Sequence, residues 1–134
     1  MAKIERITRD CMKPLMEPYG LCEAVRHGDT LTIAGTTGID ARQQVVEGGL
    51  KAQAVQAFRN IGAILEAAGA SQENLVHLTW YLADAPNPFL EDAFAVTAAR
   101  DEIFPGLTCG NTAVRVKALL TPELLIEVNG TAAL

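Results

Sequence analysis

One stretch decides the fold: residues 49–82, which read GLKAQAVQAFRNIGAILEAAGASQENLVHLTWYL. Its first part carries an apolar residue at every third or fourth position, the pattern of an amphipathic helix. This stripe consists of Leu50, Ala54, Phe58, Ile61, Leu65 and Ala68. Gly69 follows, and glycine is the preferred residue just past a helix end. The last part changes to a period of two, with Val76, Leu78, Trp80 and Leu82 on one face. The stretch predicts a helix over residues 49–68 and a strand over residues 75–82.

Upstream, the sequence predicts a hairpin. Two strand-like segments, Cys22–Arg26 and Thr30–Thr36, flank the turn sequence His27-Gly28-Asp29. Gly35, Gly38 and the polar residues up to Gly49 then predict a loop.

Downstream, the sequence predicts a second helix and two more strands. Asn87-Pro88 is typical of a helix start, with the asparagine side chain as cap, and the helix should run to about Phe104. The two strands are expected over Thr112–Leu119 and Leu124–Gly130, joined by a tight turn at Thr121-Pro122. The predicted order is therefore β-β-α-β-α-β-β. Two β-α-β crossovers place both helices on one face of a mixed sheet, which is an α+β fold.

Size and composition indicate one globular domain over residues 1–134. The chain is 49% hydrophobic and 20% charged, which excludes a disordered protein. That apolar share is high for a small domain. The predicted helices leave the other sheet face without cover, and its strands carry apolar residues too. We therefore expect association in a closed ring or dimer, with sites in the clefts between subunits.

Charge, hydropathy and cysteine content exclude several classes of partner and site. A net charge of −5, with scattered basic residues, argues against nucleic-acid binding. No apolar run approaches the roughly 20 residues that cross a bilayer, and residues 1–6 lack a signal-peptide core. The three cysteines form no C-x-x-C pair, so neither a zinc site nor a disulfide framework is expected. The sequence predicts a soluble, cytoplasmic protein without membrane contact.

Glu127 is the first candidate for chemistry. It lies within Leu124-Leu125-Ile126-Glu127-Val128, and a lone acid among apolar strand residues is costly unless it is paired or functional. A raised pKa would let it transfer protons near neutral pH. The alternative is a charge on an edge strand, or an ion pair with Arg115 or Lys117 on the neighbouring strand.

Two further features have both a functional and a structural interpretation. Cys109, in the loop at residues 106–111, is a possible nucleophile, but no sequence signal links it to a histidine base. The segment Ala34–Gly38 is either a simple turn or a loop whose threonines bind a ligand. It matches no phosphate-binding or dinucleotide-binding motif.

Several segments together resemble the RidA (YjgF) family of enamine/imine deaminases, over nearly the whole chain. They are Pro18-Tyr19, the helix with Asn60-Ile61 and Leu65-Glu66-Ala67-Ala68-Gly69, Phe104-Pro105-Gly106, and residues 122–128 ending in Leu125-Ile126-Glu127-Val128. The resemblance implies a chorismate-mutase-like α+β fold and a homotrimer with sites at its subunit interfaces. It also implies hydrolysis of small enamines or imines without a cofactor or metal.

The resemblance assigns roles to individual residues. Glu127 falls on the family's catalytic glutamate and Tyr19 on its tyrosine, and these are the predicted catalytic residues. Asn111, Gly35, Thr36 and Cys109 are the predicted substrate-binding residues. Three positions depart from the family: Asn111 replaces the carboxylate-binding arginine, Ala34 replaces a serine, and Ala93 replaces an asparagine of the second helix.

Two functions follow from this comparison. The first is a divergent hydrolase that deaminates a small imine, enamine or related C=N compound, with Glu127 guiding water. Because an arginine–carboxylate contact is absent, its substrate is expected to be less anionic than 2-aminoacrylate. The second is a trimeric protein of the same fold that binds a small molecule without deaminase activity.

Overall fold

The computed structural model describes residues 3–134; Met1 and Ala2, which belong to the stretch analysed for a signal peptide, lie outside the described residues. The strands are β1 (Ile4–Ile7), β2 (Ala24–His27), β3 (Thr30–Thr37), β4 (Leu75–Ala83), β5 (Gly110–Val116) and β6 (Ile126–Ala133). The α-helices are α1 (Lys13–Met16), α2 (Gly49–Ala67) and α3 (Phe89–Ile103), and the 3₁₀ turns are η1 (Asp10–Met12), η2 (Glu17–Tyr19) and η3 (Gln72–Asn74). The predicted α+β class, the hairpin and both long helices are confirmed.

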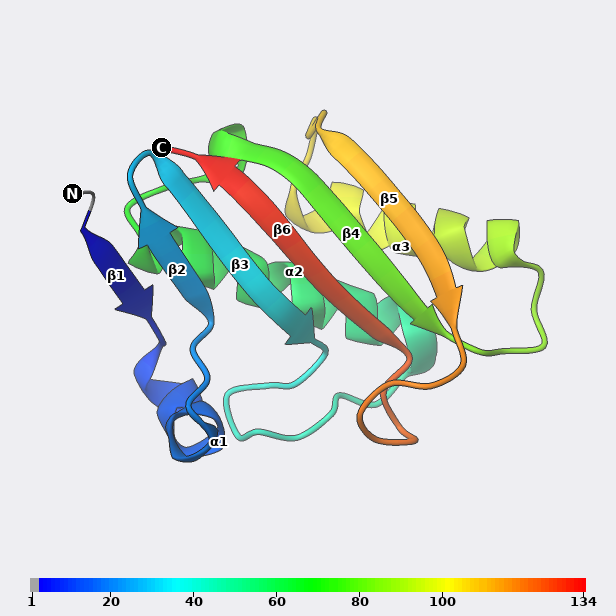
Figure 1. Ribbon diagram of the computed structural model, residues 1–134. Helices are drawn as coiled ribbons and strands as arrows, with labels where there is room; N and C mark the ends of the chain where they lie inside the picture. The colour runs from blue at the N-terminus through cyan, green and yellow to red at the C-terminus, as the bar shows by residue number, and fades with distance from the viewer. Residues whose placement is uncertain (1–2) are drawn as a thin grey trace.

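The strands form one mixed sheet in the order β1-β2-β3-β6-β4-β5. β6 pairs antiparallel with both β3 and β4, and β5 pairs parallel with β4. Figure 1 shows β6 in red between cyan β3 and green β4. The predicted tight turn at Thr121-Pro122 is therefore wrong as a hairpin connection. β5 and β6 are not neighbours, because the chain passes from the sheet edge to its centre through residues 117–125.

The sheet also differs from prediction at its ends. The additional edge strand β1 pairs with β2 through Ile4↔His27 to Ile7↔Ala24. β5 begins two residues before the predicted start, and β6 begins two residues after its predicted start. β1 is four residues long and mostly exposed, so no alternation of buried residues marks it in the sequence.

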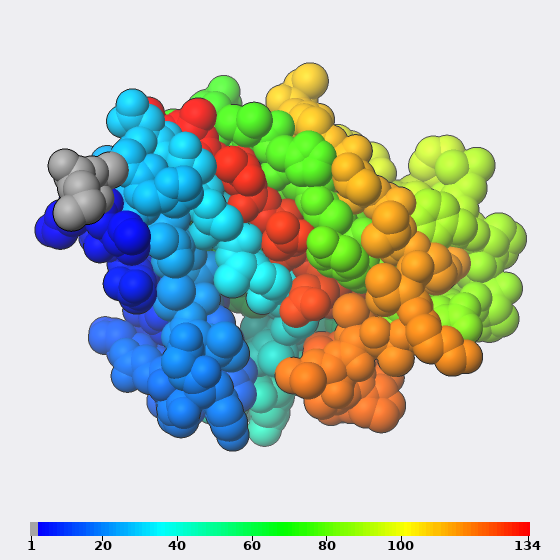
Figure 2. Space-filling model, viewed as in Figure 1, coloured from blue at the N-terminus to red at the C-terminus, as the bar shows by residue number. Residues whose placement is uncertain are grey.

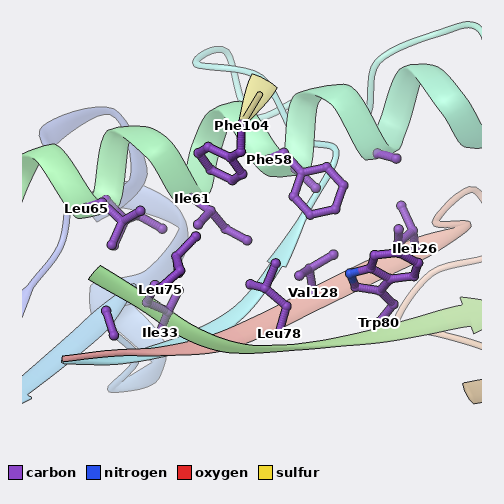
Figure 3. Packing of buried hydrophobic residues seen from close by; sticks show 14 of the residues in the cluster. Ile33, Phe58, Ile61, Leu65, Leu75, Leu78, Trp80, Phe104, Ile126 and Val128 are labelled. Atoms are coloured by element: carbon purple, nitrogen blue, oxygen red, sulfur yellow. The ribbon is translucent and has the colours of Figure 1, made fainter. Parts of the chain in front are cut away.

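Both long helices lie behind the sheet in Figure 1, and the core fills the space between these two layers. Figure 3 shows the aromatic centre of this core, where Phe58 of α2 meets Trp80 and Phe104. The two ring pairs are edge-to-face, with centroids 6.3 Å and 6.0 Å apart. The stripe expected on the first helix is the buried one, since Ala54, Phe58, Ile61 and Leu65 are at most 1% exposed.

The opposite sheet face carries no helix. Figure 2 views this face, where the side chains of β2, β3, β6, β4 and β5 lie open to the viewer. We call it the uncovered face. Val76 departs from the predicted strand face: it is 50% exposed, whereas Leu78, Trp80 and Leu82 are buried. The register of β4 against β6 shifts between Leu75 and His77, so Leu75 takes the buried position instead.

The start of α3 also differs from prediction. Pro88 is the residue preceding the helix, and no side chain caps the first turn. The Asn87 amide instead donates to Oδ1 of Asp92 at 3.3 Å, because Asn87 lies one position too early to cap the helix.

None of the helices in the described part of the chain is both long and apolar enough to span a membrane.

Candidate functional site

Glu127 lies in the second position of β6, near the middle of the sheet. It pairs with Thr37 on β3 and with Tyr81 on β4. Its neighbours Ile126 and Val128 are fully buried on the helix side. Because successive strand residues point to opposite faces, the carboxylate of Glu127 projects from the uncovered face.

A β-bulge in β3 makes room for this carboxylate. The register between β3 and β6 shifts between Ile33, which pairs with Gly130, and Thr36, which pairs with Val128. Gly35 lies inside the bulge, and a Cβ added there would lie 2.6 Å from Oε1 of Glu127. No side chain fits at that distance, so only glycine allows the Glu127 carboxylate to lie against β3.

The surroundings of Glu127 favour its protonated form. Partial burial raises the pKa of its carboxyl group above the ordinary value, since desolvation disfavours the charge. Among residues 3–134 no lysine or arginine forms an ion pair with it. A carboxyl group with a raised pKa is suited to exchange protons near neutral pH.

Both predicted alternatives are wrong: β6 is not an edge strand, and Glu127 forms no ion pair with β5 among the described residues. Arg115 instead donates from Nη1 to Oδ2 of Asp92 on α3 at 2.8 Å, and Asp92 is 5% exposed. Lys117 lies just after β5 and is exposed. β4 separates β5 from β6, so neither cation has Glu127 as its direct cross-strand neighbour.

Two buried amides of α2 hold the backbone around Glu127. Gln53 donates from Nε2 to the carbonyl of Glu123 at 2.9 Å and accepts from the backbone N–H of Leu125 at 2.8 Å. These two bonds fix the segment that leads into β6. The Asn60 amide donates to the carbonyls of Thr37 and Ile39 at 3.0 and 2.8 Å, which fixes the end of β3.

Thr36 lies within β3, so the turn or loop predicted over Ala34–Gly38 is wrong for all but its last residue, because these residues pair with β6 around the bulge. Its side chain is buried, at 8% exposure, and its hydroxyl donates to the carbonyl of Ala34 at 2.9 Å. The Thr36 hydroxyl therefore stabilises the bulge. Thr37 and Tyr81, which pair directly with Glu127, are the neighbours that the sequence analysis did not identify. Only the cross-strand register reveals them.

The predicted site residues Tyr19 and Asn111 lie far apart within one chain. Tyr19, 76% exposed, ends η2 in the connection from β1 to β2. Asn111 lies on β5, at the opposite edge of the sheet, and pairs with Leu78. Since the whole sheet separates the two edges, a single chain does not bring Tyr19 and Asn111 together.

Cys109 directly precedes β5 and packs partly buried against the core. Burial raises the pKa of its thiol, so the thiolate is a minor form at neutral pH. The described residues contain no group of three or more metal-ligating histidine, cysteine or acidic side chains.

A surface groove of about 480 Å³ lies elsewhere, along α2 and the loop that precedes it. Its lining includes Val46, Lys51, Val55 and Arg59, and none of the predicted site residues.

Comparisons with known proteins identify relatives along nearly the whole chain. The family described as Endoribonuclease L-PSP matches residues 14–134. A RutC family protein of Pyrococcus horikoshii is 34% identical over 126 residues, covering 93% of both chains. A mouse 2-iminobutanoate/2-iminopropanoate deaminase is 36% identical over 103 residues, covering 76% of this chain and 71% of that protein.

Solved structures with the same fold come from the same group of proteins. RidA from an Antarctic Psychrobacter is 32% identical, with a TM-score of 0.74 over 84% of this chain and 87% of that one. A member of the YjgF/YER057c/UK114 family from Mycobacterium tuberculosis is 25% identical, with a TM-score of 0.80 over 98% of this chain and all of the other. The matches in sequence and in fold agree, and the chain belongs to the RidA (YjgF) family, which the Endoribonuclease L-PSP description covers.

Proposed function

We propose that this protein hydrolyses a small imine or enamine to a carbonyl compound and ammonia, with Glu127 as the proton-transferring group. The observation that carries the proposal is the partly buried Glu127 carboxylate, which lies against Gly35 on the uncovered face and has a raised pKa. The printed activity of the mouse relative, deamination of 2-iminobutanoate and 2-iminopropanoate, supports the same reaction class.

The reaction needs water and one group that moves protons. Glu127 as a carboxylate accepts a proton from water while the oxygen attacks the C=N carbon, and the π electrons move to nitrogen. Glu127 gives that proton to the nitrogen, which yields the carbinolamine R₂C(OH)NH₂. Glu127 then accepts the hydroxyl proton and passes it to the nitrogen as the C–N bond breaks and the C=O bond forms, so R₂C=NH and H₂O give R₂C=O and NH₃. No cofactor takes part in this scheme.

We propose further that the site is completed between subunits of a homotrimer. Tyr19 and Asn111 belong to opposite edges of the sheet, so an adjacent copy must supply at least one of them to Glu127. A cyclic ring joins two different surfaces at every interface and thus suits this arrangement. Light scattering at micromolar concentration should give about three times 14.3 kDa, whereas a 14.3 kDa species alone would exclude shared sites.

Asn111 determines the proposed substrate class. An amide donates one or two hydrogen bonds but has no charge, whereas a bidentate arginine holds a carboxylate with about 2–4 kcal/mol more binding free energy. We therefore propose that the substrate carries a neutral carbonyl or amide next to its C=N group, and that free imino acids bind weakly.

The experiment generates 2-aminoacrylate or 2-aminocrotonate in situ with a dehydratase and follows its decay. The wild type is compared with Glu127→Gln and with a matched control, Glu123→Gln, whose residue is exposed in the loop before β6. We expect faster decay with the wild type and the control, and a loss of about 10²-fold or more with Glu127→Gln. Equal decay with and without the wild-type protein, for these substrates and for their neutral amide analogues, would refute the proposal.

The alternative is a trimeric protein that binds a small molecule without turnover. Asn111 in place of the expected arginine is the observation that favours it. Saturable binding of a neutral amide or keto compound by calorimetry, without any turnover of the matching imine, would establish this alternative.

A further inference from the structure

A buried ion pair joins the two ends of the segment between β1 and β2. The Glu23 carboxylate accepts from Nη2 of Arg9 at 2.6 Å, from its Nε at 3.0 and 3.2 Å, and from its backbone N–H at 2.9 Å. Glu23 is only 4% exposed, so Arg9 replaces the water that an exposed carboxylate would bind. These contacts fix the position of Glu23 in the fold.

The backbone of Glu23 contacts the strands on both sides of it. Its N–H donates to the carbonyl of Ile7 at the end of β1, at 3.0 Å, and its carbonyl accepts from the N–H of Ala34 on β3, at 2.9 Å. Ala34 directly precedes Gly35 and lies in the part of β3 where the register against β6 shifts. The position of Glu23 therefore determines where one side of the bulge lies.

The bulge connects Glu23 to the candidate site. Oε1 of Glu127 occupies the space that a Cβ on Gly35 would need. Gly35 is bonded to Ala34 in the chain, so a movement of Ala34 moves Gly35 and changes the space available to the Glu127 carboxylate. A continuous series of contacts thus runs from the Arg9 guanidinium to the acid of the site.

We propose that the ion pair between Arg9 and Glu23 positions Glu127, because it fixes the bulge against which the Glu127 carboxylate lies. Arg9 and Glu23 are positioning residues, and neither of them touches the substrate in this proposal. The effect of the pair on turnover rests on the proposed function, whereas its effect on the surroundings of Glu127 does not.

A second buried ion pair provides the matched control. Arg115 and Asp92 lie 2.8 Å apart with side-chain exposures of 22% and 6%, compared with 2.6 Å, 20% and 5% for Arg9 and Glu23. Removing either arginine leaves a buried carboxylate without its cation, so Arg9→Met and Arg115→Met should lose similar amounts of stability. The hydrogen bonds of Arg115 go to α3, to the connection before it and to the end of β4. A general loss of stability therefore affects both variants, and a displaced bulge affects only Arg9→Met.

The first test titrates Glu127 directly and needs no activity. Carboxyl ¹³C NMR of the whole protein gives the pKa of Glu127, with its signal assigned from Glu127→Gln. Burial raises this pKa in the wild type, so a displaced bulge that admits water should lower it toward the ordinary value in Arg9→Met. Loss of the Arg9 charge alone would raise the pKa, so the direction of the shift separates displacement from direct electrostatics.

Two further variants complete the titration. Arg115→Met should leave the pKa of Glu127 at its wild-type value. Arg9→Lys keeps the charge but loses the bonds from Nε, so it should fold even if Arg9→Met does not, and it should lower the pKa by less. An unchanged or raised pKa of Glu127 in every Arg9 variant that folds, or an equal shift in Arg115→Met, would overturn the proposal.

The second test is kinetic. Arg9→Met should lower kcat for imine hydrolysis about tenfold with little change in KM, since a small displacement of a reacting group slows the reaction. The acidic limb of its pH profile of kcat/KM should move to lower pH, because that limb reports the pKa of the free enzyme's base. Arg115→Met, assayed at a temperature where both variants are folded, should change neither. An unchanged kcat and pH profile in Arg9→Met would refute the role in the reaction. A wild type that hydrolyses no imine would refute the proposed function, and the titration would still decide whether the ion pair positions Glu127.

Discussion

The Glu127 carboxylate fills the space above the α-carbon of Gly35. An ideal Cβ on Gly35 would lie 2.6 Å from Oε1 and 2.8 Å from Cδ of Glu127, distances that real Cβ atoms do not show. Position 35 therefore controls where the acid can be, although it carries no functional group.

A methyl group at position 35 should lower activity while leaving stability nearly unchanged. In Gly35→Ala the carboxylate must rotate away, which is easy for the end of a flexible side chain. We expect the free energy of unfolding to stay within about 1 kcal/mol of the wild type. Imine hydrolysis should fall by about 10²-fold, since its proton acceptor is displaced. Activity assays and chemical denaturation measure the two effects.

Gly62→Ala is the matched control for that substitution. Gly62 lies inside α2, and a Cβ there would meet the Phe104 ring at an ordinary 3.5 Å. We expect a gain of about 0.5–1 kcal/mol in stability, because alanine favours the helix, with activity unchanged. Full activity in Gly35→Ala would show that the contact between Gly35 and Glu127 is irrelevant to the reaction.

The raised pKa of Glu127 predicts a pH-dependent gain in stability for Glu127→Gln. Burial raises the folded-state pKa of this carboxyl above its unfolded value, so the folded protein binds the proton more tightly. In the wild type, the buried charge lowers the free energy of unfolding. This loss is absent below the unfolded pKa of about 4.3, where the folded and unfolded states are both protonated, and it develops as the pH rises through the folded pKa. In thermal unfolding, the Tm of Glu127→Gln should therefore be higher than that of the wild type at pH 7.5 and equal to it near pH 3.5. A variant that is less stable at pH 7.5 would contradict this.

Arg115 should contribute to folding rather than to the site. Its guanidinium bonds Asp92, the carbonyls of Ala83 and Asn87, and stacks on Phe89 with 5.3 Å to the ring centroid. Arg115→Met leaves the buried Asp92 carboxylate without its cation and should cost about 3 kcal/mol or more in urea denaturation. Lys117→Met, at an exposed position just after the same strand, should change stability by less than about 0.5 kcal/mol. Equal effects of the two variants would argue against the buried pair.

An arginine at position 111 should broaden the substrate range toward anionic imines. Asn111 is exposed on the edge strand β5, so the longer side chain has room. We expect Asn111→Arg to lower KM for imino acids about tenfold or more and to leave KM for a neutral amide analogue unchanged. Asn111→Gln is the control for side-chain length. A KM that is indifferent to Asn111→Arg for all substrates would place the substrate elsewhere.

Local sequence patterns predict the elements that depend on local interactions. The three-to-four residue period of residues 49–68 and the alternation after Leu75 correspond to α2 and β4, because burial of one face imposes each period. The position of β6 is different. It pairs with β3 across 90 or more residues of sequence, and no local pattern encodes that pairing, so the turn at Thr121-Pro122 suggested a hairpin instead.

The same contrast holds within the candidate site. An acid among apolar residues marks Glu127, because burying a lone charge is costly. Its contact with Gly35 depends on a register shift between two strands. Bulges are defined only once strands pair. The roles of Tyr19, Asn111 and Cys109 stay predictions, since they depend on how copies of the chain meet.

The position of β6 between β3 and β4 has a consequence for synthesis of the protein. During translation β3, α2 and β4 leave the ribosome before β6. β3 and β4 do not pair with each other, because their shared neighbour in the sheet is β6. Until β6 is available, both strands expose an unpaired edge, and the core between the sheet and α2 lacks the residues that β6 supplies. The nascent chain should therefore depend on chaperones until β6 has been made, and any truncation before β6 should aggregate rather than form a smaller stable domain.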